Sequence, residues 1–161
     1  MKLEGVVGTS AAFVLGVILL AACGGRKHAA TEPLVIHERL HIAAKEHSEP
    51  IATGAILAGS TLGGTPFCVR GSIRDTHASR DPEMKAYLIE RKITCPNGTV
   101  RIGFTPVVGA DPQSPTQKGS WTIVSGTGAF AGLHGRGKSM TFYGPTPDSP
   151  VRETSTGTVT R

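Results

Sequence analysis

The sequence predicts an all-β protein that folds as a single antiparallel barrel of eight strands. Glycine and proline are abundant, with 21 and 11 of the 161 residues, and both interrupt helices. From residue 34 onward, apolar and polar side chains alternate, as expected for strands that bury one face. Eight consecutive antiparallel strands would leave two open edges, which closure into a barrel removes.

The strand-like segments follow one another to the end of the chain. In the first, leucine and isoleucine occupy positions 34, 36, 40 and 42, while histidine and arginine occupy positions 37, 39 and 41. Pro96-Asn97-Gly98 predicts a tight hairpin between the fourth and fifth strands, because Asn and Gly tolerate positive φ. The stretches 106–116 and 144–150, rich in Pro, Asp and Ser, are expected to be exposed loops. The expected strands are 34–42, 50–58, 67–74, 84–95, 99–108, 117–124, 134–143 and 152–160.

The amino terminus has the pattern of an export signal. Lys2 precedes an apolar stretch, residues 6–22, which ends in Leu20-Ala21-Ala22-Cys23. This ending resembles the lipobox of bacterial lipoproteins. The resemblance implies that Cys23 receives a diacylglycerol thioether and becomes the first residue of the mature chain, with its acyl chains anchored in membrane lipid. An ordinary secretory cleavage site and an uncleaved anchor helix are the alternatives.

Three regions follow from this interpretation: a lipoprotein signal peptide over 1–22, a lipidated flexible tether over 23–33 and a barrel domain over 34–161. The expected location is the extracytoplasmic face of a cell membrane.

The formal net charge is +5, but the basic residues are spread along the chain and only 5% of residues are aromatic. This distribution argues against nucleic-acid binding and favours a basic face that lies over an anionic membrane surface.

Cys68 and Cys95 remain once Cys23 is assigned to lipid. Outside the cytoplasm a disulfide is the expected state of such a pair. Both cysteines lie in strand-like sequence, which suits a bridge between neighbouring strands and would stabilise the fold by about 3–4 kcal/mol in the chain-entropy model. A catalytic thiol is the alternative, but no motif accompanies either cysteine.

The most specific stretch is residues 121–137, WTIVSGTGAFAGLHGRG. It resembles the Gly-Gly-Thr-Gly-x-Phe/Tyr-x-Gly…Gly segment of the allene oxide cyclase and dirigent barrel superfamily, with Ser125 in place of the first glycine. It is also similar to small secreted actinobacterial proteins of that type. The resemblance covers 117–143 well and the strand layout of 50–160 loosely. It implies a calycin-like barrel.

The glycines of this stretch are expected to form a structural turn. Gly126 and Gly128 permit a sharp reversal, Phe130 fills the space beneath it, and Gly132 and Gly135 let the chain re-enter the sheet. We therefore expect Gly128→Val to destabilise the domain, Gly126→Ala to do so less, and Thr127→Ala to be nearly silent. A phosphate-binding loop is the alternative, but such a loop should open a helix, whereas the following residues have a strand pattern.

One metal motif occurs. His37-Glu38-Arg39-Leu40-His41 spells H-E-x-x-H, with His47 near the place of a third ligand. In zinc proteases this motif lies on a helix, but the alternation over 34–42 indicates a strand. Weak zinc or copper binding by His37, His41 and His47 is a remote alternative to exposed polar residues.

Two further pairs could supply acid–base chemistry in a barrel mouth: Asp75 with His77, and Glu90 with Arg91. The second pair is more simply explained as the solvated face of a strand. No cofactor motif is present, and no catalytic residue is assigned.

The sequence therefore predicts a membrane-anchored lipoprotein that binds a small apolar ligand in its barrel or has an interaction role in the envelope, without catalysis. The alternative is a cyclase or isomerase that acts on a hydrophobic substrate. An interior pocket lined by Tyr, Glu or Arg would favour the enzyme, whereas a filled barrel would exclude both pocket functions.

Overall fold

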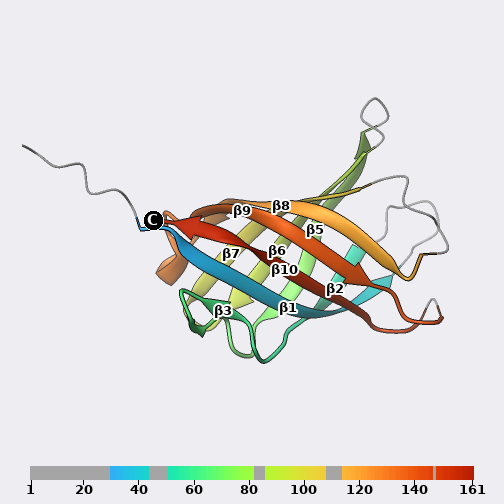
Figure 1. Cartoon of the computed structure of the whole chain (residues 1–161), viewed down its shortest axis with the longest axis horizontal. Helices are drawn as coiled ribbons and strands as arrows, with labels where there is room; N and C mark the ends of the chain where they lie inside the picture. The colour runs from blue at the N-terminus through green and yellow to red at the C-terminus, as the bar shows by residue number, and fades with distance from the viewer. Residues whose placement is uncertain (1–29, 44–50, 82–85, 108–113, 147) are drawn as a thin grey trace, which may run out of the picture.

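A computed structural model describes residues 30–43, 51–81, 86–107, 114–146 and 148–161, and these form a closed antiparallel barrel of eight strands (Figure 1). Each strand pairs with its neighbours in the sheet, and the pairing of the last strand with the first closes the barrel. The predicted fold class is confirmed. The barrel strands are β1 (Glu32–Ala43), β2 (Ile51–Ile56), β5 (Ser72–Asp81), β6 (Ala86–Cys95), β7 (Gly98–Pro106), β8 (Thr116–Gly126), β9 (His134–Phe142) and β10 (Val151–Thr160).

Two short elements lie outside the regular barrel. A small hairpin, β3 (Thr61–Leu62) and β4 (Thr65–Pro66), extends the sheet beyond β1, and a 3-10 turn, η1 (Gly128–Phe130), connects β8 to β9. Both lie at the end of the barrel where β6 ends and β7 begins, which we term the packed end. The opposite end, where β7 ends and β8 begins, is termed the cavity end.

Apolar side chains fill the packed end. Phe67 and Phe130 meet edge to face, with their ring centroids 5.6 Å apart. Trp121 is buried, and its indole N–H donates a hydrogen bond to the carbonyl of Lys138. Phe130 therefore fills the space beneath the turn, as predicted. The remaining apolar side chains buried among them or next to them include Leu34, Ile36, Ile93, Val100, Ile102, Leu133 and Val159.

The third expected strand, 67–74, is wrong in its position. Strand β5 begins at Ser72, and residues 67–71 form a loop in which Cys68 and Arg70 have positive φ, 52° and 65°. Positive φ is incompatible with a strand. Phe67 and Cys68 are buried because they cap the packed end from this loop, whereas Val69 is exposed. Strand β5 continues past the expected end to Asp81. The short hairpin of β3 and β4 has no counterpart in the prediction.

The disulfide between Cys68 and Cys95 is present, so this prediction is confirmed. The sequence also predicts that both cysteines lie in strands, and this prediction is wrong for Cys68. The bond joins the loop before β5 to the last residue of β6, which fixes the loop across the packed end.

The turn after β8 uses its glycines in two different ways. Gly128 and Gly132 have φ of +59° and +73°, the left-handed region that favours glycine. Gly126 does not share this backbone conformation, but a Cβ there would overlap the carbonyl oxygen of Phe130. Gly135 likewise has no room for a Cβ, because Val159 lies against it.

The turn is also bonded to the neighbouring hairpin. The Thr127 hydroxyl accepts a hydrogen bond from the Thr99 backbone N–H at 3.1 Å and shares a second bond with the Thr99 hydroxyl at 2.8 Å. The expectation that Thr127→Ala is nearly silent therefore does not follow from this geometry. Loss of such bonds lowers stability by about 0.5–1.5 kcal/mol.

Candidate functional site

A buried arginine surrounded by three acidic side chains lies inside the barrel. Arg91 projects inward from β6 and contacts Asp75 of β5, Glu38 of β1 and Glu153 of β10. The nitrogen–oxygen distances are 2.7 Å from Nε to Asp75, 2.6 Å from Nη1 to Glu38 and 2.9 Å from Nη1 to Glu153. Strands from several sides of the barrel thus meet at one guanidinium, which we term the Arg91 cluster.

The members of the Arg91 cluster are buried and almost fully hydrogen-bonded. Arg91 is 3% exposed, and its guanidinium also stacks 4.5 Å from the ring centre of Phe104. Asp75 accepts a further hydrogen bond from the backbone N–H of Ala52 at 3.1 Å. Glu153 accepts one from the Thr141 hydroxyl at 2.9 Å. These hydrogen bonds and ion pairs offset the free-energy cost of burying charged groups inside the barrel.

Glu38 is the exception, because its Oε1 is buried and has no hydrogen-bond partner among the described residues. Burial raises the pKa of Glu38 from 4.5 to about 8; Arg91 opposes this shift, and the charge of Glu153 adds to it. Glu38 therefore carries a proton at neutral pH. With Asp75 and Glu153 as carboxylates, one positive and two negative charges remain in the cluster.

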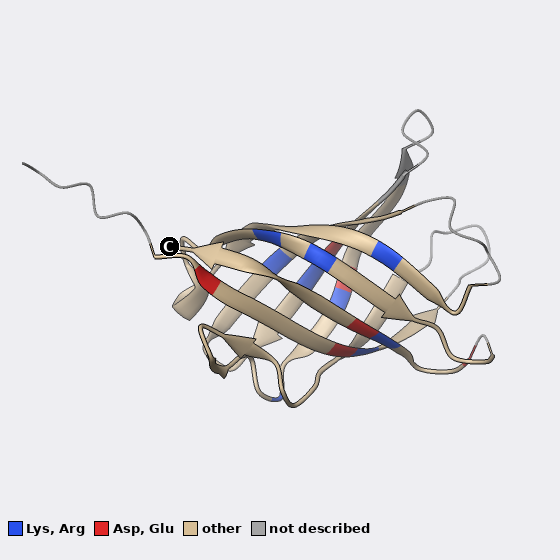
Figure 2. Cartoon of the chain, viewed as in Figure 1, with Lys and Arg blue, Asp and Glu red and all other residues tan. Residues whose placement is uncertain are grey.

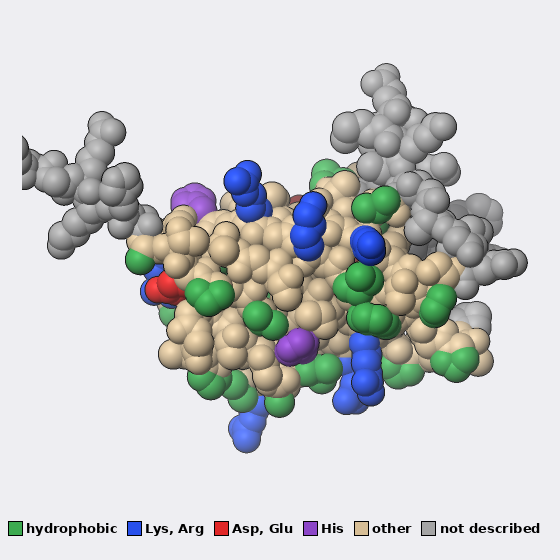
Figure 3. Space-filling view, viewed as in Figure 1, with side chains coloured by type: hydrophobic (Ala, Val, Ile, Leu, Met, Phe, Trp, Pro, Cys, Tyr) green, Lys and Arg blue, Asp and Glu red, His purple; other side chains and the backbone are tan. Residues whose placement is uncertain are grey.

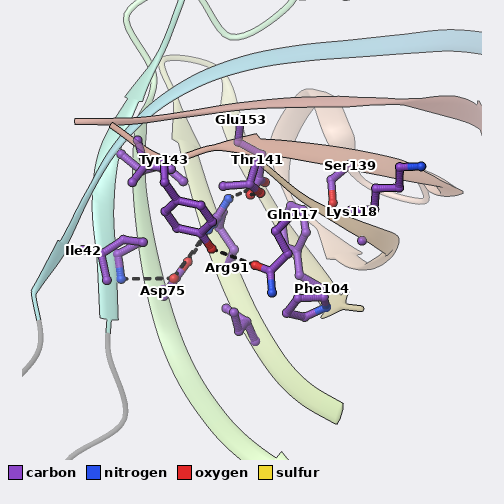
Figure 4. A pocket seen from close by; sticks show the side chains of 16 residues that line it. Ile42, Asp75, Arg91, Phe104, Gln117, Lys118, Ser139, Thr141, Tyr143 and Glu153 are labelled. Carbon is purple, nitrogen blue, oxygen red and sulfur yellow. Dashed lines mark hydrogen bonds and ion pairs between the residues drawn. The ribbon is translucent and has the colours of Figure 1, made fainter. Parts of the chain in front are cut away.

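A cavity of about 200 Å³ separates the Arg91 cluster from the cavity end (Figure 4). Figure 4 shows Arg91 between Asp75 on one side and Glu153 with Thr141 on the other. Glu38 is not among the residues that line this cavity. The apolar wall consists of Leu40, Ile42, Ala52, Ile89, Phe104, Pro106 and Val151. The polar lining consists of Asp75, Arg91, Gln117, Lys118, Ser139, Thr141, Tyr143 and Glu153.

A tyrosine and a glutamine form the second polar group of the cavity. The Tyr143 hydroxyl, just after β9, donates a hydrogen bond of 2.7 Å to the side-chain oxygen of Gln117 on β8. Partial burial raises the pKa of Tyr143, and the charge of Glu153 raises it further. Tyr143 is therefore neutral at physiological pH, and its hydroxyl lies on the cavity surface.

The H-E-x-x-H motif lies on strand β1, so the zinc-protease arrangement is excluded for it. Consecutive side chains of a strand point to opposite sides, and Glu38 is 0% exposed inside the barrel while His41 is exposed outside. His37 also faces outward, where its Nδ1 lies 3.1 Å from the Thr154 hydroxyl. Within the part of the chain that the structure describes, no three His, Cys, Asp or Glu side chains are grouped to hold a metal ion. His47 and Cys23 lie outside the described residues.

The two expected acid–base pairs do not form. Asp75 points inward, but a bulge follows it in β5, and His77 is exposed on the outer surface. Arg91 is buried in the barrel, so the solvated-face interpretation is wrong for it. That interpretation holds for Glu90, which forms an ion pair with Arg101 on the outside.

The cluster could have been found from the alternation itself. Glu38 lies between Ile36 and Leu40, and Arg91 lies between Ile89 and Ile93, so both occupy inward positions. A charged residue at an inward position needs a partner of opposite charge in the interior. The metal motif around Glu38 and the neighbouring Glu90 beside Arg91 drew attention away from these inward positions.

The outer surface of β8, β9, β10 and β1 is basic, and we term it the basic face. Figure 2 shows lysine and arginine on neighbouring strands here, and Figure 3 shows their side chains projecting from the surface. Glu153 is the one acidic residue within β8, β9 and β10, and it points into the barrel. The exposed basic residues of the face are Arg39, Lys118, Arg136, Lys138 and Arg152.

Comparisons with protein-family models, with curated proteins and with solved structures gave no match. None of the helices formed by the described residues is long and apolar enough to cross a membrane.

Proposed function

We propose that this protein is a membrane-anchored lipoprotein whose barrel binds a small, largely apolar molecule at the cavity end. The cavity beside the Arg91 cluster carries the proposal, because most of its lining surface is apolar while a few polar and charged side chains border it. Ligand sites in proteins combine these two features, an apolar enclosure and a few polar groups that orient the ligand. The interior is neither filled nor uniformly polar.

The cavity volume limits the ligand. A cavity of about 150 Å³ accommodates benzene, so one of about 200 Å³ accommodates a molecule of roughly ten non-hydrogen atoms. A monocyclic aromatic compound or a short branched chain fits this volume. A long fatty chain exceeds it.

The binding proposal is tested by filling the cavity from its wall. Ala52 on β2 is buried and lines the cavity, whereas Ala55 on the same strand is exposed. Benzyl alcohol serves as the probe, and amide NMR shifts report its binding. We expect Ala52→Leu to weaken binding by about tenfold or more, because the added carbons occupy the ligand volume. Ala55→Leu is the matched control and should bind as wild type does. Equal binding by both variants, or no binding by the wild type, would contradict the proposal.

Membrane attachment through acylated Cys23 supplies the location, with membrane lipid as the partner. The lipobox resemblance of residues 20–23 supports this assignment, and the basic face is compatible with an anionic membrane surface nearby. Acyl chains hold the chain at the surface while the barrel remains outside the bilayer. The resemblance of residues 121–137 to the allene oxide cyclase and dirigent superfamily supports the same type of barrel.

A cyclase or isomerase is the second candidate, and the lining of the cavity is the observation that favours it. Tyr143, Glu153 and Arg91 all border the cavity, which is the composition expected of an enzyme of this kind. The Tyr143 hydroxyl and the Glu153 carboxylate are a proton donor and acceptor that a bound substrate would meet. Isomerisation of a small unsaturated epoxide, detected as a product of unchanged mass, would support catalysis. If Tyr143→Phe loses this isomerisation activity but still binds the epoxide, the proton transfer is assigned to the Tyr143 hydroxyl.

A further inference from the structure

We propose that the cavity selects molecules whose apolar body carries a cationic amine. This inference rests on the proposed binding function and adds the chemical class of the ligand. The geometry that points to it is an arginine whose hydrogen bonds are directed to acidic side chains, beside an apolar wall.

Arg91 is the buried cation of the cavity, but it is not available to an anionic ligand. Four hydrogen bonds run from its guanidinium to Asp75, Glu38 and Glu153. A guanidinium has five N–H donors, so most of its capacity is already used. A carboxylate ligand that approached Arg91 would also meet the like charges of Asp75 and Glu153, which line the cavity with it. Anions are therefore disfavoured.

The same groups favour a cation. Asp75 and Glu153 together carry two negative charges against the single positive charge of Arg91, and both border the cavity. Carboxylate oxygens accept more than one hydrogen bond, so both residues retain acceptor capacity for an ammonium group. The low dielectric of the barrel interior strengthens this attraction relative to water.

The other charged residue of the lining does not cancel this preference. Lys118 belongs to the cavity lining, but its side chain is exposed on the outer surface of β8. Water therefore screens its ammonium group from the interior. The Tyr143 hydroxyl and the Ser139 hydroxyl add neutral oxygens, both of which can accept a hydrogen bond from an amine.

Three probes of nearly equal shape separate the charge preference from the existence of the site: benzylamine as the cation, benzyl alcohol as the neutral molecule and benzoate as the anion. At pH 7 we expect the wild-type protein to bind benzylamine about tenfold or more tightly than benzyl alcohol, because a hydrogen bond between charged groups is stronger than a neutral one. Benzoate should not bind measurably.

The outcomes distinguish the two proposals. Binding of benzyl alcohol or benzoate as tightly as benzylamine would overturn the charge preference and leave the binding site in place. Absence of binding by all three probes would overturn the binding function itself. This comparison uses only the wild-type protein, so it does not depend on how any variant folds.

The variant Glu153→Gln tests whether the preference for a cationic ligand arises from the cavity lining. Glu153→Gln keeps a hydrogen-bond acceptor for Arg91 and removes one negative charge. The ratio of the affinity for benzylamine to that for benzyl alcohol should therefore fall close to one, and this ratio is the quantity compared with wild type. Lys138→Gln on the outer surface of β9 is the control and should retain the preference. A preference that survives Glu153→Gln unchanged, in a variant with a cooperative melt, would contradict the assignment.

Discussion

Glu38 is a carboxyl group held inside the barrel at 0% exposure. Its neighbours are Arg91, which favours the charged form, and Glu153, which disfavours it. Burial dominates, so the pKa rises from 4.5 to about 8, and the folded chain holds a proton that the unfolded chain releases. The associated stability is fully present below pH 4.5 and is lost as the pH rises through about 8.

Replacement of Glu38 by glutamine tests this linkage. Glu38→Gln is neutral at every pH, so it should remove this group's share of the fall in Tm between pH 5 and pH 9. Relative to wild type, we expect the variant to melt roughly 5–10 °C higher at pH 9 and similarly at pH 5. Thermal melts at these two values measure the difference. An unchanged pH dependence in the variant would contradict the assignment of the buried proton to Glu38.

At the scale of the element, the turn between β8 and β9 combines backbone conformation with close approach. Gly128 has a positive φ, and a Cβ there would overlap the carbonyl oxygen of Asn97 in the neighbouring hairpin. Gly132 has a positive φ as well, but no atom lies within 4 Å of the position of its Cβ. A side chain at Gly132 would therefore cause backbone strain alone, whereas one at Gly128 would cause both backbone strain and steric overlap.

We predict that Gly128→Ala is more destabilising than Gly132→Ala. Gly132→Ala incurs only the strain of a left-handed alanine, about 1 kcal/mol. Gly128→Ala has the same backbone strain and must also displace the turn at Asn97. It should therefore lower the free energy of unfolding by about 2–4 kcal/mol. Urea denaturation of both variants measures the two values. Equal losses would show that the contact with Asn97 contributes nothing, and the turn would then depend on backbone conformation alone.

The elements that were predicted correctly are those in which one physical signal dominates. Alternation located β1, β9 and β10 within about two residues, and Asn97-Gly98 located the hairpin between β6 and β7. The segment 67–71 misled the prediction because its buried apolar residues resemble a strand, although they cap the packed end from a loop. Burial alone cannot distinguish these two cases, since it does not report the sign of φ.

The Arg91 cluster was predictable only in part. Alternation assigns Glu38 and Arg91 to the interior, but it does not say which strands meet there. The contact of β1 with β10 at the closure of the barrel brings Glu38 and Glu153 to the same guanidinium. This is a consequence of sheet order and shear, which no local sequence pattern encodes.

At the scale of the whole molecule, the two ends of the barrel have different roles. The packed end holds the aromatic cluster, the disulfide and the extra hairpin, and β1 also begins there. The proposed tether from Cys23 therefore joins the barrel at its packed end, away from the cavity. The basic face runs along the side of the barrel between the two ends.

The lipid anchor at Cys23 and the charge of the basic face are expected to contribute separately to membrane binding, so each can be tested alone. Cys23→Ser should release the full chain from the membrane fraction, and incorporation of labelled fatty acid should be lost. The released protein should still bind vesicles of phosphatidylglycerol at low salt and dissociate at high salt, because charges on an exposed surface are screened. Vesicles of phosphatidylcholine should not bind it. A Cys23→Ser protein that stays in the membrane fraction with its fatty-acid label would contradict the lipobox assignment.

The orientation on the membrane is the last prediction, and a matched pair of charge reversals tests it. Lys138 projects from β9 in the basic face, whereas Lys92 is exposed on β6, across the barrel from β9 and β10. Each reversal to glutamate changes the net charge by the same amount, so an effect of net charge alone would be equal in both. In the Cys23→Ser background we expect Lys138→Glu to weaken binding to phosphatidylglycerol vesicles by about fivefold or more, since each basic residue near the surface contributes about 1 kcal/mol. Lys92→Glu should have a much smaller effect. Co-sedimentation with vesicles measures both variants, and equal weakening would show that the basic face does not orient the barrel.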